Sequence, residues 1–560
     1  MTNPIETTSL GKPMVNTRAS RSKSPKTELS SHVYDTLIVG GGITGATLLW
    51  DATLRGLRAL LVEKNDFASG TSQATSKLIH GGLRYLKNAE FALVRESLRE
   101  RRILAKISPH AVKTLGFLVP VYSMTEKLVL AAGMQMYDAF SFDKNREISP
   151  DRWIPKFRFL SKEETLIESP ALPKEGLKGA YLYYDYQNIN PERHTCEFIF
   201  SAQRNGGEAY NYTELVALSK GQEAYQAILL DKRSGKKFPV FAKTVVNAAG
   251  PWADFIESLA GVGMDKVLIR SKGIHIVTRA ISGSKALVLK KKDKTHMFVL
   301  PWRGKTIIGT TDTVYQDSPD KFKVTKNDIQ GLLEEINYAY GYTELKETDV
   351  DFFYGGMRPL VEDPGETSDT YNASRKTEII HHKDQGFPGF FTALGGKYTT
   401  SRGLAEKIAD LLCDYLPGTY LPCETNFVPL ISGEFSDLAS LIHGLANKFP
   451  KLSGEVLETV ANRYGSISYE ILQNAKPGEP YAVLANGEKL YISEIRYIAN
   501  GESIRKASDF FFHRSGAGVP GLPSAENLEF IMEELGKSLG WNQTQRKSEK
   551  AEILSRYKVG

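Results

Sequence analysis

A short apolar strand that runs into a glycine-rich turn is the feature that most constrains the fold of this chain. Residues 36–39 read TLIV and continue into GGGITG, which places Gly40, Gly42 and Gly45 in the pattern G-x-G-x-x-G ahead of a helix-forming stretch. The first glycine of this pattern makes a tight turn, the second lets the backbone approach a pyrophosphate, and the third allows close helix–strand packing. The sequence therefore predicts a Rossmann-like unit of an α/β protein that binds a dinucleotide.

The residues after this unit extend the predicted nucleotide site. A second apolar strand, RALLVE, ends at Glu63, near the position where an acidic side chain would hold a ribose hydroxyl. The segment 67–76 is small, hydroxyl-rich and without helical or strand periodicity. Thr71, Ser72 and Ser76 of this segment are predicted to contact an extended cofactor, although a plain surface loop is the alternative.

Further motifs narrow the family. In chain order they are SKLIHGGLRYL (76–86), VVNAAGPWA (245–253), IIGTTD (307–312), GGMRPL (355–360) and LGGKYTT (394–400). Together with GGGITG, they resemble the FAD-dependent glycerol-3-phosphate dehydrogenases, within the wider glycine-oxidase-like flavoproteins. The resemblance covers roughly residues 33–415. The last ~140 residues resemble the family's helical C-terminal domain only in character.

The resemblance and the pattern of elements predict several domains, as expected for a chain of 560 residues. The expected fold is an α/β Rossmann-like FAD-binding domain, a mixed-sheet substrate (cap) domain and an α-helical C-terminal domain. The expected ranges are a disordered tail at 1–32, an FAD-binding domain at 33–100, 190–270 and 355–415, a cap at 101–189 and 271–354, and helices at 425–560.

The motif LGGKYTT leads into a predicted helix, SRGLAEKIADLLCDYL. Its apolar residues Leu404, Ile408, Leu411 and Tyr415 follow helical spacing and are predicted to share one face of the helix.

Backbone N–H groups at Gly395 and Gly396, with the positive end of that helix, are suited to stabilise negative charge on a reduced flavin. Lys397 adds a full positive charge, and it is predicted to be catalytic as well as cofactor-binding. The resemblance implies the remaining cofactor contacts, at His80, Gly250 and Thr399.

Substrate-binding roles are assigned to arginines and their neighbours. Arg84 and Tyr85 match a pair at the family's substrate pocket, and arginine is suited to a phosphate dianion. Arg375 is a second phosphate candidate. By resemblance, Arg358 faces the substrate. His275 is the candidate general base, since an imidazole suits this role near neutral pH, although a buried core histidine is the alternative.

The resemblance implies oxidation of sn-glycerol 3-phosphate to dihydroxyacetone phosphate, with hydride transfer from C2 to flavin N5 and electrons passed to membrane quinone. Three alternatives stay open. They are an oxidase that reduces O2 to H2O2, an amine or amino-acid oxidase on the same scaffold, and a redox-silent flavin-binding membrane module.

Composition and charge constrain the partners and the location. A formal charge of +6 is too diffuse to predict nucleic-acid binding. The three cysteines suit a reducing compartment and form no metal-spaced cluster, so no metal is expected.

No stretch approaches the ~20 apolar residues of a spanning helix. By resemblance, the protein docks peripherally on the cytoplasmic side of the cell membrane, where the apolar run 128–134 could lie in the interface, although a buried core helix is the alternative. The basic, hydroxylated tail resembles a mitochondrial presequence, but Glu6, Glu28 and scattered prolines argue against an amphipathic helix there, so a mitochondrial location is less favoured. A homodimer is left open.

Overall fold

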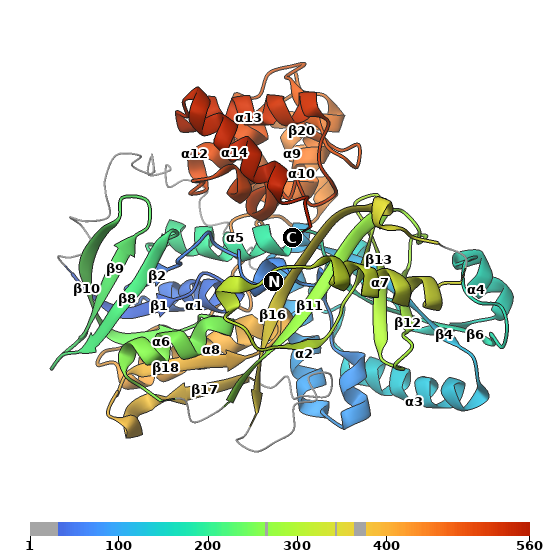
Figure 1. Ribbon diagram of the computed structural model, residues 1–560, viewed down its shortest axis with the longest axis horizontal. Helices are drawn as coiled ribbons and strands as arrows, with labels where there is room; N and C mark the ends of the chain where they lie inside the picture. The colour runs from blue at the N-terminus through green and yellow to red at the C-terminus, as the bar shows by residue number, and fades with distance from the viewer. Residues whose placement is uncertain (1–31, 264–266, 342–343, 363–376, 560) are drawn as a thin grey trace, which may run out of the picture.

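The computed structural model describes residues 32–263, 267–341, 344–362 and 377–559. They form two large sheets side by side and a helical C-terminal domain that lies across them, coloured orange to red in Figure 1. Arg375 and most of the predicted tail lie outside the described residues. The α/β fold class, with a Rossmann-like unit, a second mixed sheet and a helical C-terminal domain, is confirmed.

The first sheet contains the predicted nucleotide-binding strands. Its central strands run parallel in the order β18-β10-β1-β2-β7, with β17 antiparallel at one edge and the hairpin β8–β9 attached to β10. The bounds are β1 (Val33–Val39), β2 (Ala59–Val62), β7 (Glu208–Tyr210), β8 (Thr213–Lys220), β9 (Tyr225–Asp231), β10 (Lys236–Asn247), β17 (Thr377–His381) and β18 (Phe390–Gly395). The parallel order brings the carboxyl ends of β1, β2, β10 and β18 to one edge.

Three helices cover one face of this sheet, and α1 (Ile43–Leu54) packs between α5 (Pro191–Arg204) and α8 (Ser401–Tyr415). The predicted apolar face of α8 is buried only in part. Leu404 and Ile408 are buried, but Leu411 and Tyr415 are 39% and 42% exposed. The buried stripe instead follows positions 404, 405, 408, 409 and 412, which pack into the same apolar core as α1.

The second sheet is mixed. Its order is β15-β11-β14-β13-β12-β4-β6-β3, with β16 paired to β11 and β5 to β6. The bounds are β3 (Leu78–Ile79), β4 (Val112–Val121), β5 (Arg158–Leu160), β6 (Gly179–Asn188), β11 (Val267–Arg279), β12 (Ala286–Lys290), β13 (His296–Trp302), β14 (Lys305–Gly309), β15 (Thr313–Tyr315) and β16 (Val350–Glu362). The predicted domain boundary at residue 355 falls within β16.

Helices cover both faces of the second sheet. One face packs against α7 (Lys326–Ala339), and the other against α2 (Phe91–Ile107), α3 (Met124–Phe140) and the C-terminal domain. Two short helices lie at the periphery, α4 (Lys162–Glu168) beside this sheet and α6 (Ala253–Ala260) beside the first.

The C-terminal domain is built from helices that share one apolar core with the second sheet. Its elements are α9 (Leu438–Lys448), α10 (Gly454–Tyr464), α11 (Ser468–Ile471), α12 (Ile492–Gly501), α13 (Ala525–Leu539), α14 (Gln543–Ser555) and the hairpin β19 (Tyr481–Val483) and β20 (Lys489–Tyr491). Among the helices of the described ranges, none is long and apolar enough to cross a membrane.

Candidate active site

A cavity of about 760 Å³ runs along the carboxyl ends of the first sheet. Its volume lies within the range of ~300–1,000 Å³ that is typical of ligand pockets. Nine of the predicted site residues line it: Gly40, Gly42, Glu63, Thr71, Ser72, Gly250, Gly395, Gly396 and Lys397. Segments far apart in the sequence therefore meet at one elongated hollow, as a dinucleotide requires.

The glycine turn after β1 is sterically constrained. Gly40 has a φ of +116°, and a Cβ there would lie 2.6 Å from the carbonyl oxygen of Ala248. A Cβ on Gly45 would lie 1.9 Å from the carbonyl oxygen of Gly40, so α1 could not approach β1 with any larger residue. Gly45 therefore packs behind the cavity wall rather than lining it. This arrangement is the close helix–strand contact that the pattern predicts.

Glu63 and Ser72 stabilise the same turn from its two sides. The Glu63 carboxylate accepts the backbone N–H of Gly41 at 2.7 Å and of Asn65 at 2.8 Å. Burial raises the pKa of Glu63, while these two N–H groups act in the opposite direction. Ser72, on the 3₁₀ turn η2 (Thr71–Gln73), accepts the N–H of Ile43 at 2.9 Å, at the start of α1. A ribose contact for Glu63 stays a prediction.

Three of the predicted residues meet next to the 395–398 end of the cavity. The Lys397 Nζ lies 3.6 Å from the centre of the Tyr85 ring and 3.4 Å from Ser97 Oγ on α2. The Arg84 guanidinium lies 5.0 Å from the same ring centre, and its Nη2 donates to the Tyr85 hydroxyl at 3.4 Å. Tyr85 is buried and Arg84 exposed. Two positive groups therefore gather on one aromatic ring, a favourable geometry for an anionic ligand.

Arg358, on β16, is held by Ser271 on β11 and by Thr310 and Thr311, which lie between β14 and β15. It donates to Ser271 Oγ at 3.1 Å, to Thr310 Oγ1 at 2.7 Å and to the carbonyl oxygen of Thr311 at 3.2 Å. A Cβ on Gly273 would lie 2.2 Å from its Nη2, so the absence of a side chain at that position makes room for the guanidinium. The side chain is 21% exposed. Its guanidinium is therefore fixed in place but still open to a ligand.

His275 is buried on β11, and its ring faces Ser76. Its Nε2 lies 2.9 Å from Ser76 Oγ, and its ring stacks on Tyr354 with 5.0 Å between centres. Nδ1 is buried and has no hydrogen-bond partner within the described part of the chain. Burial, with the charges of Arg358 and Lys77, lowers the pKa of His275 to about 3. The ring is therefore neutral at pH 7, as a proton acceptor must be, but the lowered pKa also makes it a weaker base than a free imidazole.

Two other predicted residues, His80 and Thr399, lie in contact with each other. The backbone N–H of His80 donates to Thr399 Oγ1 at 3.4 Å. Neither residue lines the cavity. The same is true of Arg84, Tyr85, Arg358 and His275. Their cofactor and substrate roles stay predictions.

Part of the site was missed from the sequence. Residues of β8 and α6 line the cavity, and Trp252 donates its Nε1–H to Asp320 at 2.8 Å. Lys64 lies over the Trp252 ring at 4.7 Å and pairs with Asp320 at 2.7 Å. In the sequence, Trp252 of the motif NAAGPWA was the one residue that could have indicated this part of the cavity. Asp320 could not, because it lies in a turn far along the chain.

The residues present fit FAD. The glycine turn leaves a cradle beside the N-terminus of α1 that a Cβ would fill, as pyrophosphate binding requires. At the other end Gly395 and Gly396, both with positive φ, expose backbone next to Lys397, suited to the charge of a reduced flavin.

Comparisons with known proteins agree with this fit. Residues 35–411 match the family model described as FAD dependent oxidoreductase, and residues 423–546 match the C-terminal domain of alpha-glycerophosphate oxidase. A glycerol-3-phosphate dehydrogenase from Synechocystis sp. is 36% identical over 78% of this chain and 77% of its own length. An aerobic glycerol-3-phosphate dehydrogenase from Staphylococcus haemolyticus is 32% identical over 94% of this chain and 95% of its own.

A solved structure shares the whole architecture. The glycerol-3-phosphate dehydrogenase from Bacillus halodurans, complexed with FAD, superposes with a TM-score of 0.76 at 26% identity, covering 95% of this chain and 96% of that one. The chain therefore belongs to the FAD-dependent oxidoreductases, as an enzyme of the glycerol-3-phosphate dehydrogenase family with FAD as its cofactor.

Proposed function

We propose that this enzyme oxidises sn-glycerol 3-phosphate to dihydroxyacetone phosphate. The observation that supports this substrate is the group formed by Arg84, Tyr85 and Lys397 next to the cavity, because two positive side chains on one ring suit a phosphate ester. The relatives that are 32% and 36% identical to this chain are named for the same substrate.

In this proposal the chain's own residues bind and orient the substrate. Arg84 binds the phosphate, Tyr85 forms the wall beneath it, and Arg375 is a second phosphate ligand. Arg358, whose direction is fixed by Ser271 and Thr310, holds the reacting hydroxyl. FAD supplies the hydride acceptor when it is bound.

Lys397 and His275 complete the proposed chemistry. Lys397 places positive charge where reduction develops negative charge. His275 is neutral at pH 7 and accepts the hydroxyl proton, and its contact with Ser76 orients the ring. In this proposal the cofactor is held by the predicted cofactor-binding residues: Gly40, Gly42, Glu63, Thr71, Ser72, Ser76, His80, Gly250, Gly395, Gly396, Lys397 and Thr399.

We further propose that electrons leave to a membrane quinone while the enzyme lies peripherally on the cytoplasmic side of the cell membrane. The support is the outer face of α3, whose large apolar side chains are exposed: Met124 59%, Leu128 69%, Val129 66% and Met136 40%, with Phe142 at 78% just beyond. Basic side chains flank it, since Arg95 lies over the Phe142 ring and Lys127 over that of Phe159. The exposed apolar face suits a lipid interface, and Lys127 lies at its edge, whereas the charge of Arg95 is compensated by Asp143 at 2.8 Å.

The double variant Leu128→Glu, Val129→Glu tests the membrane surface. Flotation with vesicles that contain anionic lipid should be lost, while reduction of the flavin by substrate stays unchanged. The matched control is Leu421→Glu, because Leu421 is 60% exposed on a loop after α8. Equal flotation of the double variant and the control would rule out α3 as the docking face.

A second candidate is an oxidase that passes electrons to O2. It is favoured by the match of residues 423–546 to the C-terminal domain of alpha-glycerophosphate oxidase. Release of H2O2 in aerated buffer at the rate of substrate oxidation would establish it over the quinone-linked reaction.

The decisive experiment is anaerobic. The visible absorbance of the purified holoenzyme is followed after addition of sn-glycerol 3-phosphate, glycerol, and a panel of amino acids. Bleaching by the phosphate ester alone is expected, since glycerol lacks the phosphate that Arg84 binds. Bleaching by an amino acid instead would support the amine or amino-acid oxidase alternative and contradict the proposal.

A further inference from the structure

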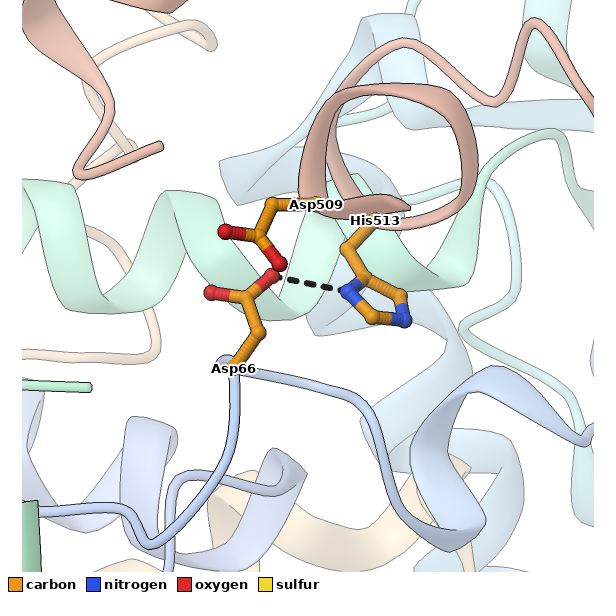
Figure 2. A group of neighbouring side chains, drawn as sticks. All are labelled: Asp66, Asp509 and His513. Carbon is orange, nitrogen blue, oxygen red and sulfur yellow. Dashed lines mark hydrogen bonds and ion pairs between the residues drawn. The ribbon is translucent and has the colours of Figure 1, made fainter. Parts of the chain in front are cut away.

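A buried cluster of charged side chains joins the C-terminal domain to the nucleotide-binding domain. Figure 2 shows Asp66, on the loop that follows β2, facing the helical turn that carries Asp509 and His513. This turn, η13 (Asp509–Arg514), is π-helical, a rare conformation that occurs frequently at functional sites. His513 Nδ1 lies 2.7 Å from Asp66 Oδ2, and Arg514 donates to both Asp66 oxygens at 2.8 and 2.9 Å. All four residues are at most 3% exposed.

Every carboxylate oxygen of this cluster already accepts a hydrogen bond. Asp66 also accepts from Asn211 at 2.7 Å, and Asp509 accepts from the Tyr212 hydroxyl at 2.6 Å and from two backbone N–H groups. Although burial alone would raise it, the charge of Arg514 holds the pKa of Asp66 well below its usual value. The cluster is thus a satisfied ion-pair network that anchors η13, and its oxygens are not vacant metal ligands.

The other nitrogen of His513 contacts segment 69–73, which lies behind the FAD cavity through Gln73 and lines it through its other residues. Its Nε2 lies 3.2 Å from Gln73 Oε1, on η2, and the Gln73 side-chain amide donates to the carbonyl oxygen of Ser69. Ser69 and Ser72 line the cavity, and Ser72 accepts the first N–H of α1, from Ile43. One buried imidazole therefore connects the anchored C-terminal domain to the segment that flanks the pyrophosphate cradle.

We propose that His513 and Gln73 are positioning residues, through which the C-terminal domain holds segment 69–73 in the conformation that binds FAD. The segment is small, hydroxyl-rich and without periodic structure of its own, so it needs support from outside. Support that fixes a binding segment in advance increases affinity by lowering the ordering cost of binding. The inference rests on the assignment of this cavity to FAD and does not depend on the identity of the substrate.

The test compares FAD binding by the variants His513→Gln and Gln73→Leu with the wild type. The measured quantities are the FAD dissociation constant, from titration of the apoprotein, and the melting temperature of the apoprotein. Each variant should bind FAD about tenfold more weakly, the effect of losing one buried hydrogen bond. The double variant should bind FAD no more weakly than the single variant with the lower FAD affinity, because both residues act through the same contact. Gln73→Glu keeps an acceptor for His513 but removes the amide donor to the Ser69 carbonyl, so it should not recover the affinity.

The matched control is His110→Gln. His110 is also buried, also hydrogen-bonds a carboxylate, Glu197, at 2.9 Å and also packs against the C-terminal part of the chain, at Phe435, but this carboxylate lies on α5 and not in segment 69–73. Its FAD affinity should equal that of the wild type. Unchanged affinity in Gln73→Leu, or an equal loss in His110→Gln, would overturn the proposal. A wild type that binds FAD without being reduced by sn-glycerol 3-phosphate would instead contradict only the proposed function.

Discussion

Lys397 and His275 show how the surroundings of a side chain define its chemical state. The Lys397 ammonium lies on the face of Tyr85, a cation–π contact of roughly 0.5–2 kcal/mol, and so stays close to the cavity end. His275 is kept neutral because burial and two nearby cations oppose its protonation. One residue thus supplies fixed positive charge, and the other can accept a proton.

Removal of the Lys397 charge should slow the chemical step. In Lys397→Met, the rate of flavin reduction in a stopped-flow experiment should fall by about 10²–10³-fold, the usual effect of removing one preorganised electrostatic contact. Lys407→Met is the control, since Lys407 is an exposed lysine on α8 that pairs with Glu96. If the rate of flavin reduction falls only slightly, and to the same extent, in both variants, Lys397 is not catalytic.

The depressed pKa of His275 makes a pH-dependent prediction for stability. The folded pKa of about 3 lies below the unfolded value of 6.5, so the unfolded chain binds the extra proton first. The contribution of neutral His275 to the free energy of unfolding is complete above the pKa of the unfolded state. It is lost as the pH falls toward the pKa of the folded state, at about 1.4 kcal/mol per pH unit at most. Between about pH 6.5 and 5, the free energy of unfolding should therefore fall less steeply in His275→Gln than in the wild type. Equal slopes in denaturant titrations would show that His275 titrates normally.

At the scale of elements, glycine positions are decided by what lies opposite them. Gly45 on α1 faces the Gly40 carbonyl, whereas a Cβ added to Gly133 on α3 would have nothing within 4 Å of it. The same residue type is therefore indispensable to packing in one helix and merely a weak helix former in the other.

This contrast can be measured with a pair of alanine variants. Gly45→Ala should destabilise the protein by about 1–3 kcal/mol through overpacking and should weaken FAD binding. Gly133→Ala should instead stabilise it by about 0.5–1 kcal/mol without affecting FAD. Unfolding midpoints and FAD dissociation constants check both, and a stable, FAD-saturated Gly45→Ala variant would contradict the close contact.

At the scale of the whole molecule, buried and exposed ion pairs hold the C-terminal domain on the rest of the chain. Asp66–Arg514 is fully buried, whereas Arg204–Glu470, which joins α5 to α11, has side chains 43% and 25% exposed. Solvent screens the second pair but not the first, so their energies should differ widely.

Breaking each pair measures this difference. Arg514→Met leaves Asp66 buried and charged, and it should cost about 3–5 kcal/mol of stability. Arg204→Met removes a screened pair and should cost at most about 1 kcal/mol. Calorimetry of both variants provides the comparison. Similar melting temperatures would show that the C-terminal domain is held by its apolar core rather than by the Asp66 network.

The sequence by itself determined the local and periodic features of this protein. The strand–glycine–helix unit, the helices at 401–415 and 525–539 and the strand around His275 could be predicted because hydrophobic periodicity and glycine spacing act over short distances. The motifs also identified the family and its cofactor, since each is a contiguous run of residues.

Only the tertiary structure decided which residues from distant segments meet. Lys397 meets Tyr85, Asp320 meets Trp252, and His513 meets Gln73, and no periodicity links such pairs. The buried face of α8 and the exposed face of α3 likewise depended on which neighbours pack against each helix. The physical reason is that burial, ion pairing and the resulting pKa shifts are properties of the assembled core, which the local sequence does not contain.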